Sequence, residues 1–293
     1  MSPRPATLVL SGGGAKGAFQ VGAEEVLRRE AGFTWDRIFG VSVGALNGAL
    51  LAQLEYDRLQ QVWQTIREQD VYDKAGTLRL VWRLLILGKR GLYDNSALRK
   101  TIEKHAGGRP FKVPLHVGRV SLTSGAYELV DSDQPDILDA IWQSATMPVI
   151  WEPIGAKALV DGGLRNVTPL GDALDYHPSE LVVLICSPDA IEAVAPPRDI
   201  VDAAKRSLTD ITINEIMIND VREFVRLNAL VKQAQAAGLE LKTEKGQPLR
   251  YCPIAVIQPH TPMGDTLDFS REAIARRLAA GREAASEWLS TRK

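Results

Sequence analysis

The chain has 293 residues, of which 45% are hydrophobic and 24% are charged, and its formal net charge is −1. These values are typical of a globular protein and argue against a dedicated nucleic-acid-binding protein, which usually carries a basic excess. The two cysteines, Cys186 and Cys252, each lie in an apolar, strand-like run, so we expect buried free thiols rather than a disulfide.

The N-terminal part of the chain, residues 1–54, predicts strands that alternate with helices. Residues 8–10 form a short apolar run that ends in a glycine-rich loop, and apolar residues at helical spacing follow as far as Gly32. Residues 37–42 predict a second strand, which runs directly into a helix over 43–54. This order is typical of a parallel sheet with helices on its outside, so the predicted fold class is α/β.

The rest of the chain continues this pattern after one interruption. Residues 55–110 predict amphipathic helices without a strand, which we interpret as an insertion or flank that covers the sheet. No repeat or linker divides the sequence, so we expect a single domain over residues 7–289. The remaining predictions are a hairpin around Ser124-Gly125 within 115–130, helices over 136–148, 200–237 and 269–289, and strands over 157–163, 180–187 and 251–259.

The loop after the first strand reads Gly-Gly-Gly-Ala-Lys-Gly over residues 12–17 and satisfies G-x-G-x-x-G. It fits a dinucleotide-binding turn, whose backbone N–H groups hold a pyrophosphate, and equally an oxyanion hole. A dinucleotide site also needs an acidic residue at the end of the second strand. Asp36 precedes that predicted strand, and Ser42 stands at its end. The Lys16 side chain either orients a phosphate head group or is simply solvated.

Residues 40–44 read Gly-Val-Ser-Val-Gly and match the G-x-S-x-G pattern of a nucleophile elbow. The serine of such an elbow lies on a sharp turn between a strand and a helix, and both elements are predicted around Ser42. Gly40 and Gly44 are required there because larger side chains would collide with neighbouring elements. Ser42 is therefore a candidate nucleophile. The alternative is a chance match in which the serine only caps the helix.

A nucleophilic serine needs a base, and the sequence offers two kinds. His260 follows the last predicted strand, in the chain order of an α/β-hydrolase triad. Only one β-loop-α unit precedes the elbow, however, which is a poor match to that fold. Asp161 ends a short predicted strand and is followed by Gly162-Gly163, so its carboxylate could reach a serine on a neighbouring strand. Taken alone, this Asp-Gly pair is more typical of a turn.

Together, the glycine-rich loop, the G-x-S-x-G elbow and the later Asp-Gly-Gly resemble the patatin-like phospholipase family. Three further segments resemble that family: QSATMPVIWEPI (143–154), DGGLRNVTPL (161–170) and GDTLDFSREAIARRLAAG (264–281). The resemblance extends over about residues 7–289. It implies an α/β three-layer sandwich in which helices flank a mainly parallel central sheet.

The resemblance implies a Ser–Asp dyad in place of a triad, with Ser42 as the nucleophile and Asp161 as the base. The implied reaction is hydrolysis of carboxylic esters of lipids through an acyl-enzyme, of phospholipase A, lysophospholipase or esterase type, without a cofactor. One departure is Val41, at a position where the family often has threonine. The resemblance also implies an oxyanion hole of backbone N–H groups from Gly12, Gly13, Gly14 and Val43, and motif glycines at Gly17, Gly40, Gly44, Gly162 and Gly163.

Two other functions remain open from the sequence. One is a Rossmann-type nucleotide-binding protein in which Ser42 is structural. The other is a non-catalytic patatin-like scaffold that binds lipid or protein, although the presence of both Ser42 and Asp161 argues against it. No Cys/His cluster has the spacing of a zinc site, so we expect no metal, and we expect no nucleic-acid partner.

Residues 76–92 are the most apolar part of the predicted insertion, and all of their charges are positive. Such a segment can lie in a membrane interface as a lid or docking face, or pack as a core helix whose arginines reach water. The chain begins without the long apolar run of a signal peptide, so we expect a cytoplasmic protein, either free or peripheral on a membrane. The expected partner is a lipid ester substrate.

Overall fold

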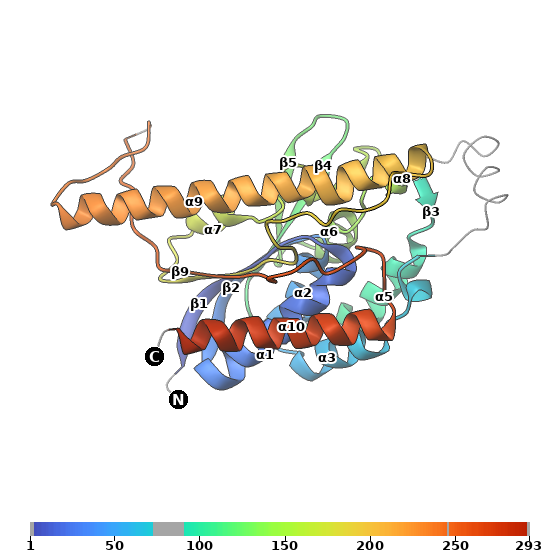
Figure 1. The fold of residues 1–293 in the computed structure, drawn as a ribbon, viewed down its shortest axis with the longest axis horizontal. Coiled ribbons are helices and arrows are strands. Elements are labelled where there is room, and N and C mark those ends of the chain that lie inside the picture. Colours follow the sequence, from blue (N-terminus) through green and yellow to red (C-terminus); the bar gives the residue numbers. More distant parts are fainter. Residues whose placement is uncertain (1–2, 73–90, 245, 292–293) are drawn as a thin grey trace.

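The computed structural model describes residues 3–72, 91–244 and 246–291, and its centre is a seven-stranded sheet (Figure 1). The strands β4, β2, β1, β8 and β9 are parallel neighbours in that order, which confirms the mainly parallel sheet. β5 and β7 both pair with β4 in the antiparallel sense. The strands are β1 (Arg4–Leu10), β2 (Phe33–Val41), β4 (Leu115–Ser121), β5 (Tyr127–Asp131), β7 (Leu159–Asp161), β8 (Leu181–Leu184) and β9 (Ile254–Ile257).

Helices cover both faces of this sheet and form the predicted three layers. Figure 1 shows α1 and α10 below the sheet, and α7 and α9 above it. Side chains alternate along each strand, so Leu8 and Leu10 pack in the core on one face while Val9 packs in the core on the other. The covering helices are α1 (Ala18–Ala31), α2 (Val43–Ala52), α3 (Tyr56–Thr65) and α10 (Arg271–Ser290) on the first face, and α7 (Leu170–Leu174) and α9 (Ile213–Ala236) on the second.

The first and last helices of the chain, α1 and α10, pack with their backbones in contact. A Cβ added at Gly22 would lie 2.1 Å from the carbonyl oxygen of Leu278, and one added at Gly281 would lie 2.0 Å from that of Phe19. A larger side chain at either position would push the helices apart. The two glycines thereby hold the C-terminal helix beside the helix that follows the glycine-rich loop.

The stretch 55–110 contains the helices α3 and α5 (Ser96–Ala106), as predicted, but it is not free of strands. Residues 91–93 form β3, which pairs in parallel with β6 (Val149–Trp151) in a separate two-stranded sheet. The strand was missed because three residues carry no periodicity, and only the distant partner makes them a strand. Most of residues 76–92, for which a membrane-interface segment and a core helix both remained open from the sequence, lies outside the described residues. Within the described residues, every helix is too short or too polar to cross a membrane.

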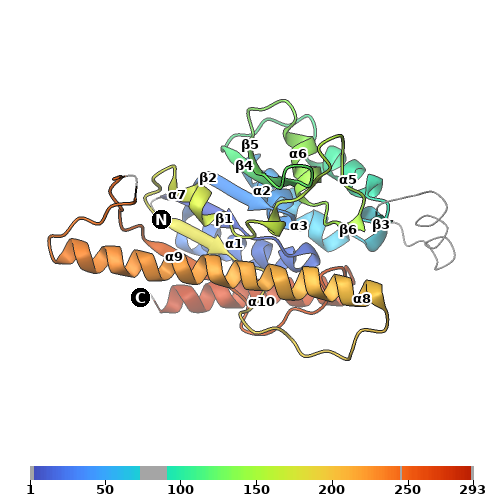
Figure 2. The same ribbon diagram turned by 90° about the horizontal axis from the view of Figure 1, so that it is seen from above.

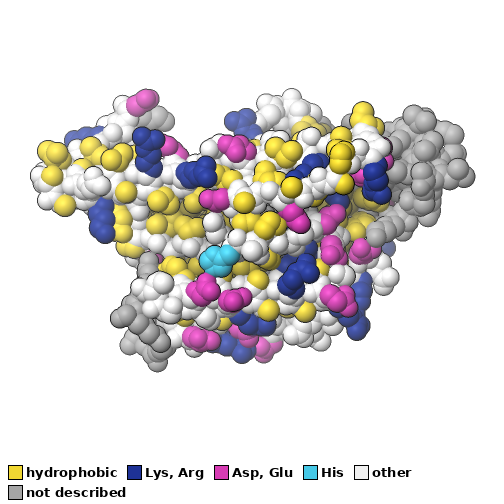
Figure 3. Space-filling view, viewed as in Figure 1, with side chains coloured by type: hydrophobic (Ala, Val, Ile, Leu, Met, Phe, Trp, Pro, Cys, Tyr) yellow, Lys and Arg dark blue, Asp and Glu magenta, His cyan; other side chains and the backbone are white. Residues whose placement is uncertain are grey.

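Other predicted elements occur close to their expected places. Residues 200–237 form α8 (Ile200–Lys205), a π-helical turn over 206–212 and α9, whose C-terminal half extends beyond the sheet (Figure 2). On the face drawn in Figure 3, apolar side chains are exposed along α9, and charges of both signs lie along α10. Residues 136–148 form α6 (Ile137–Ser144), which ends before Pro148. The two cysteines are buried free thiols, as predicted.

One prediction about β2 was wrong. β2 begins at Phe33, so Asp36 lies within the strand rather than before it. Its carboxylate accepts a 2.7 Å hydrogen bond from the Thr7 hydroxyl of β1. Asp36 therefore has a partner near the middle of β2, away from the elbow.

Candidate active site

Ser42 lies on a sharp turn between β2 and α2. Its backbone has φ 56° and ψ −125°, a combination that side-chain-bearing residues rarely adopt and that costs free energy. The flanking glycines allow this turn. A Cβ added at Gly40 would lie 2.4 Å from the carbonyl oxygen of Gly44, and one added at Gly44 would lie 2.2 Å from that of Leu10. The G-x-S-x-G pattern therefore has the local geometry of a nucleophile elbow.

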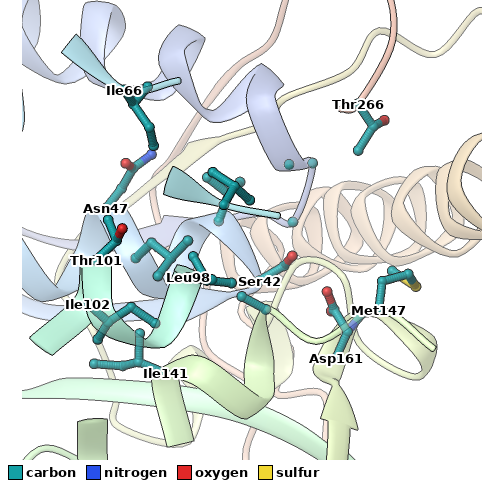
Figure 4. Close-up of a pocket in the computed structure, with 18 of the residues that line it drawn as sticks. Ser42, Asn47, Ile66, Leu98, Thr101, Ile102, Ile141, Met147, Asp161 and Thr266 are labelled. Atoms are coloured by element: carbon teal, nitrogen blue, oxygen red, sulfur yellow. The ribbon is translucent and has the colours of Figure 1, made fainter. Parts of the chain in front are cut away.

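Asp161 is brought to Ser42 by the pairing of strand β4. β2 runs parallel to β4 and ends where Val41 pairs with Gly118. β7 runs antiparallel along the same edge of β4 and ends where Asp161 pairs with the next residue, Arg119. The two strands thus run toward each other and end at neighbouring positions. Figure 4 shows the Ser42 and Asp161 side chains facing each other at one pocket.

The Asp161 carboxylate is almost completely buried, with 1% of the residue exposed. Oδ1 accepts a 2.8 Å hydrogen bond from the Gly163 N–H, whereas Oδ2 is buried without a hydrogen-bond partner of normal geometry among the described residues. Burial raises the pKa of Asp161 to about 7, and the nearby Ser42 hydroxyl and the Gly163 amide offset only part of this rise. A carboxylate with this pKa is a far better base at neutral pH than a solvated aspartate.

The glycine-rich loop passes directly beside Ser42. A Cβ added at Gly12 would lie 3.3 Å from Ser42 Cβ, so the loop backbone comes this close to Ser42 only because this position has no side chain. The Gly12 N–H, however, donates a 3.1 Å hydrogen bond to the Val167 carbonyl. In this arrangement Gly12 is not a free oxyanion donor, contrary to what the resemblance implied. The Val167 carbonyl, which takes this hydrogen bond, comes from a segment that no local pattern connects with the loop.

The next two loop residues, Gly13 and Gly14, have backbone N–H groups that, among the described residues, are free to donate hydrogen bonds to a bound molecule. Gly13 has φ 155° and Gly14 has φ 55°, and added Cβ atoms would lie 2.4 Å from Cys186 Cβ and 2.5 Å from the Thr266 carbonyl oxygen, respectively. In the described part of the chain, neither N–H has a hydrogen-bond acceptor. The same holds for the Val43 N–H at the start of α2, where helix amides have no partner within the helix.

Buried amide side chains hold the loop against the elbow helix. Asn47 of α2 donates to the Gly17 carbonyl (3.0 Å) and to Gln20 Oε1 (2.9 Å), and accepts from Trp63 Nε1 (2.8 Å). Gln20 of α1 in turn donates to the carbonyls of Ser11 (2.9 Å) and Leu184 (3.1 Å). Every polar atom of the two amide side chains is thereby satisfied, which makes the arrangement rigid.

An apolar cavity of about 130 Å³ opens at Ser42 and Asp161. Ser42, Asp161 and Gly12 to Gly14 lie on its wall, and α2, α3, α5 and α6 supply apolar side chains (Figure 4). Among these apolar side chains are Leu50, Leu59, Ile66, Leu98, Ile102 and Ile141. The predicted insertion 55–110 thus contributes, through α3 and α5, to the walls of this cavity.

A second cavity of about 380 Å³ shares Gly12, Gly13 and Thr266 with the first and is more polar. Lys205 forms an ion pair with Asp265 at 2.9 Å on its wall. Lys16 also lines this cavity, and its ammonium makes no hydrogen bond or ion pair with a described side chain. Burial lowers the pKa of Lys16, and nearby carboxylates oppose that shift.

The histidines lie in other environments. His260 is exposed and forms a 2.7 Å ion pair with Glu287, and His116 bonds to Arg37 and Asp131. His105 lines the apolar cavity, but no hydrogen bond joins it to Ser42 or Asp161 within the described residues. In the same part of the chain, no group of three His, Cys, Asp or Glu side chains could hold a metal ion.

Comparisons with curated proteins identify relatives that cover part of this chain. The protein YqhO of Bacillus subtilis, described as uncharacterized, is 28% identical over an alignment 188 residues long, which covers 55% of this chain and 64% of that protein. Neuropathy target esterase sws of Drosophila melanogaster is 28% identical over an alignment 171 residues long, which covers 55% of this chain and 11% of that protein. The chain thus spans less than two thirds of the length of these relatives.

Comparisons of structure and of family profile cover more of the chain. The crystal structure of VipD from Legionella pneumophila matches 99% of this chain and 67% of that chain, with a TM-score of 0.52 and 16% identity, which shows a shared fold. The profile of the family described as patatin-like phospholipase matches residues 8–174, more than half of the chain, including the glycine-rich loop, the elbow and the Asp-Gly-Gly turn. The chain therefore belongs to the patatin-like phospholipase family.

Proposed function

We propose that this protein is a serine acyl hydrolase that cleaves carboxylic esters of lipids through a Ser42–Asp161 dyad. The observation that carries the proposal is the meeting of a strained elbow serine with a buried carboxylate whose pKa is about 7. Membership of the patatin-like phospholipase family supports a lipid substrate. The esterase named among the relatives supports ester hydrolysis.

In the first half of the reaction, Asp161 removes the proton from Ser42 Oγ as that oxygen attacks the ester carbonyl carbon. The tetrahedral intermediate then collapses, the bond to the alcohol oxygen breaks, and the alcohol leaves with the proton that Asp161 carried. In the second half, a water molecule attacks the carbonyl carbon of the acyl-enzyme while Asp161 takes a proton from that water. The carboxylic acid leaves, and the proton returns to Ser42 Oγ.

The negative charge on the carbonyl oxygen requires hydrogen-bond donors that are already in place. We assign this role to the N–H groups of Gly13 and Gly14, with Val43 at the N-terminus of α2. Support comes from the absence of an acceptor for these amides in the described part of the chain. The N-terminus of α2 adds a partial positive charge beside Ser42.

Each of the two cavities accepts a different part of the substrate. The apolar cavity accepts the acyl chain, because its wall is built mainly of aliphatic and aromatic side chains. The polar cavity on the other side of the glycine-rich loop accepts the leaving alcohol, with Lys16 on its wall. The helices α3 and α5 of the insertion 55–110 then cover the acyl cavity.

Two observations disfavour the other functions. Asp36, the acidic residue that a dinucleotide site would use, lies within β2 and bonds to Thr7. A non-catalytic scaffold would have no need to hold a strained serine against a buried, unpaired carboxylate oxygen.

The decisive experiment is covalent labelling with a fluorophosphonate. We expect the protein to gain one adduct, mapped by mass spectrometry to Ser42, and the Ser42→Ala variant to gain none. Failure of the folded wild-type protein to react, or reaction at another residue, would reject the proposed function. Saturable binding of NAD or NADP by calorimetry would instead support the nucleotide-binding alternative.

A further inference from the structure

One short segment, residues 144–146, holds the backbones of both members of the dyad. It begins at Ser144, the last residue of α6. The Ser42 N–H donates a 2.9 Å hydrogen bond to Ser144 Oγ. The Asp161 N–H donates a 2.9 Å hydrogen bond to the Thr146 carbonyl oxygen. Both contacts are to main-chain N–H groups. The segment therefore fixes the backbones of Ser42 and Asp161 and does not contact the reacting atoms of their side chains.

This segment is itself firmly held. Ser144 and Thr146 are completely buried. The Thr146 hydroxyl donates to the Trp142 carbonyl (2.8 Å) and accepts from Asn95 Nδ2 (3.1 Å). Asn95 precedes α5, so the segment is tied to two helices at once. A hydrogen-bond acceptor placed on such a support has little freedom to follow a shift of the elbow.

The contact with Ser144 matters because Ser42 has a strained backbone. Strained conformations persist only where their surroundings over-determine them. Ser42 lies beyond the ladder of β2 and before the first turn of α2, so its N–H has no partner in either element. The Ser144 hydroxyl supplies that partner at the point of strain.

We infer that Ser144 is a positioning residue, which keeps the Ser42 backbone in its strained conformation and so keeps Ser42 Oγ in line with Asp161. The inference rests on the proposed function and adds a residue that touches neither the reacting atoms nor the substrate. Thr146 supports Asp161 in the same way through its carbonyl oxygen. The dyad geometry is thus set by a third part of the chain.

The test compares Ser144→Ala with Ser121→Ala. Ser121 is also a buried serine, and its hydroxyl bonds to Thr123 and to the Lys157 carbonyl, away from the elbow. For a soluble aryl ester, we expect Ser144→Ala to lower kcat about 10- to 100-fold with KM nearly unchanged, because small displacements of a nucleophile cost rate rather than binding. The apparent pKa of the pH–rate profile should stay where it is, since Asp161 keeps its burial. Ser121→Ala should retain wild-type kcat.

A conservative variant and a second readout complete the test. Ser144→Thr keeps the acceptor oxygen and should recover most of the lost kcat, whereas Ser144→Cys, whose sulfur is only a weak acceptor, should recover less. Amide hydrogen exchange over residues 41–46 should be faster in Ser144→Ala than in Ser121→Ala, whether or not the protein is an esterase. Equal exchange in the two variants, wild-type kcat in Ser144→Ala, or an equal loss in both variants would overturn the inference. An unlabelled, inactive wild type with faster exchange in Ser144→Ala would reject the proposed function while leaving the backbone role of Ser144 in place.

Discussion

Ser42 and Asp161 stand at the facing ends of two strands that share one edge of β4. Val41 pairs with Gly118 and Asp161 pairs with Arg119, so consecutive residues of β4 set the distance between the proposed nucleophile and the proposed base. Because strand pairing is fixed by many backbone hydrogen bonds, the dyad needs no flexible loop to bring its members together.

The first prediction concerns the dyad itself. Ser42→Ala and Asp161→Asn should each reduce hydrolysis of a short-chain aryl ester to a few per cent of wild type or less, with unchanged circular dichroism. Ser42 supplies the attacking oxygen, and an amide at position 161 cannot accept the proton. His260→Ala serves as the control and should keep most activity, because His260 is exposed and contacts Glu287. Full loss of activity in a folded His260→Ala variant would point to a triad instead.

The second prediction concerns the pH dependence of the reaction. Asp161 must be ionised to act as a base, and its pKa is raised to about 7 by burial. We therefore expect kcat/KM to rise about tenfold per pH unit below pH 7 and to level off above it. A profile that stays flat from pH 5 to pH 8 would contradict this assignment.

The third prediction follows from the same pKa shift and concerns stability. The folded state holds a proton on Asp161 more tightly than the unfolded state, whose aspartate has a pKa near 3.9. The folded state thus binds more protons between pH 4 and pH 7, and the contribution of this group to stability falls as pH rises through that window. Asp161→Asn should therefore be more stable to urea than wild type at pH 8, and this gain should vanish near pH 4.

The fourth prediction concerns the oxyanion loop. Gly14→Ala would place a Cβ 2.5 Å from the Thr266 carbonyl oxygen at φ 55°, so the loop must shift and carry its N–H groups away from the reacting carbonyl. We expect kcat to fall by about 10²–10³, the typical effect of losing one such donor. The control is Gly171→Ala, because a Cβ at that helical position meets nothing within 4 Å. Gly171→Ala should leave kcat unchanged and raise thermal stability slightly.

The fifth prediction concerns the buried amides that hold this loop. Asn47→Leu leaves Trp63 Nε1, Gln20 Oε1 and the Gly17 carbonyl without their hydrogen bonds, each at a cost of about 1–3 kcal/mol. The matched control is Asn228→Leu, since the buried Asn228 amide bonds, among the described residues, to the Cys252 backbone alone. Both variants should lose stability, but only Asn47→Leu should also lose kcat in the folded fraction. Equal kcat values in the two variants would contradict the idea that these amides support catalysis by holding the glycine-rich loop.

The sequence by itself determined the features that depend on neighbouring residues. A strand, a sharp turn and a helix around Ser42 can be predicted because glycines at 40 and 44 are the only residues that the turn accepts. The glycine-rich loop is local in the same sense, since Gly13 and Gly14 adopt backbone angles that other residues avoid. The alternation of strands and helices likewise follows from short-range periodicity.

The tertiary structure alone decided which residues meet. Asp161 reads as an ordinary Asp-Gly turn until β7 and β2 are placed on one edge of β4. From the sequence, the Gly12 N–H is expected to be a free donor, but in the fold it donates to the Val167 carbonyl. Likewise, nothing near Ser144 in the sequence shows that its hydroxyl accepts a hydrogen bond from Ser42. Each of these contacts joins residues far apart in the chain, and strand register and helix packing, rather than local propensity, set such contacts.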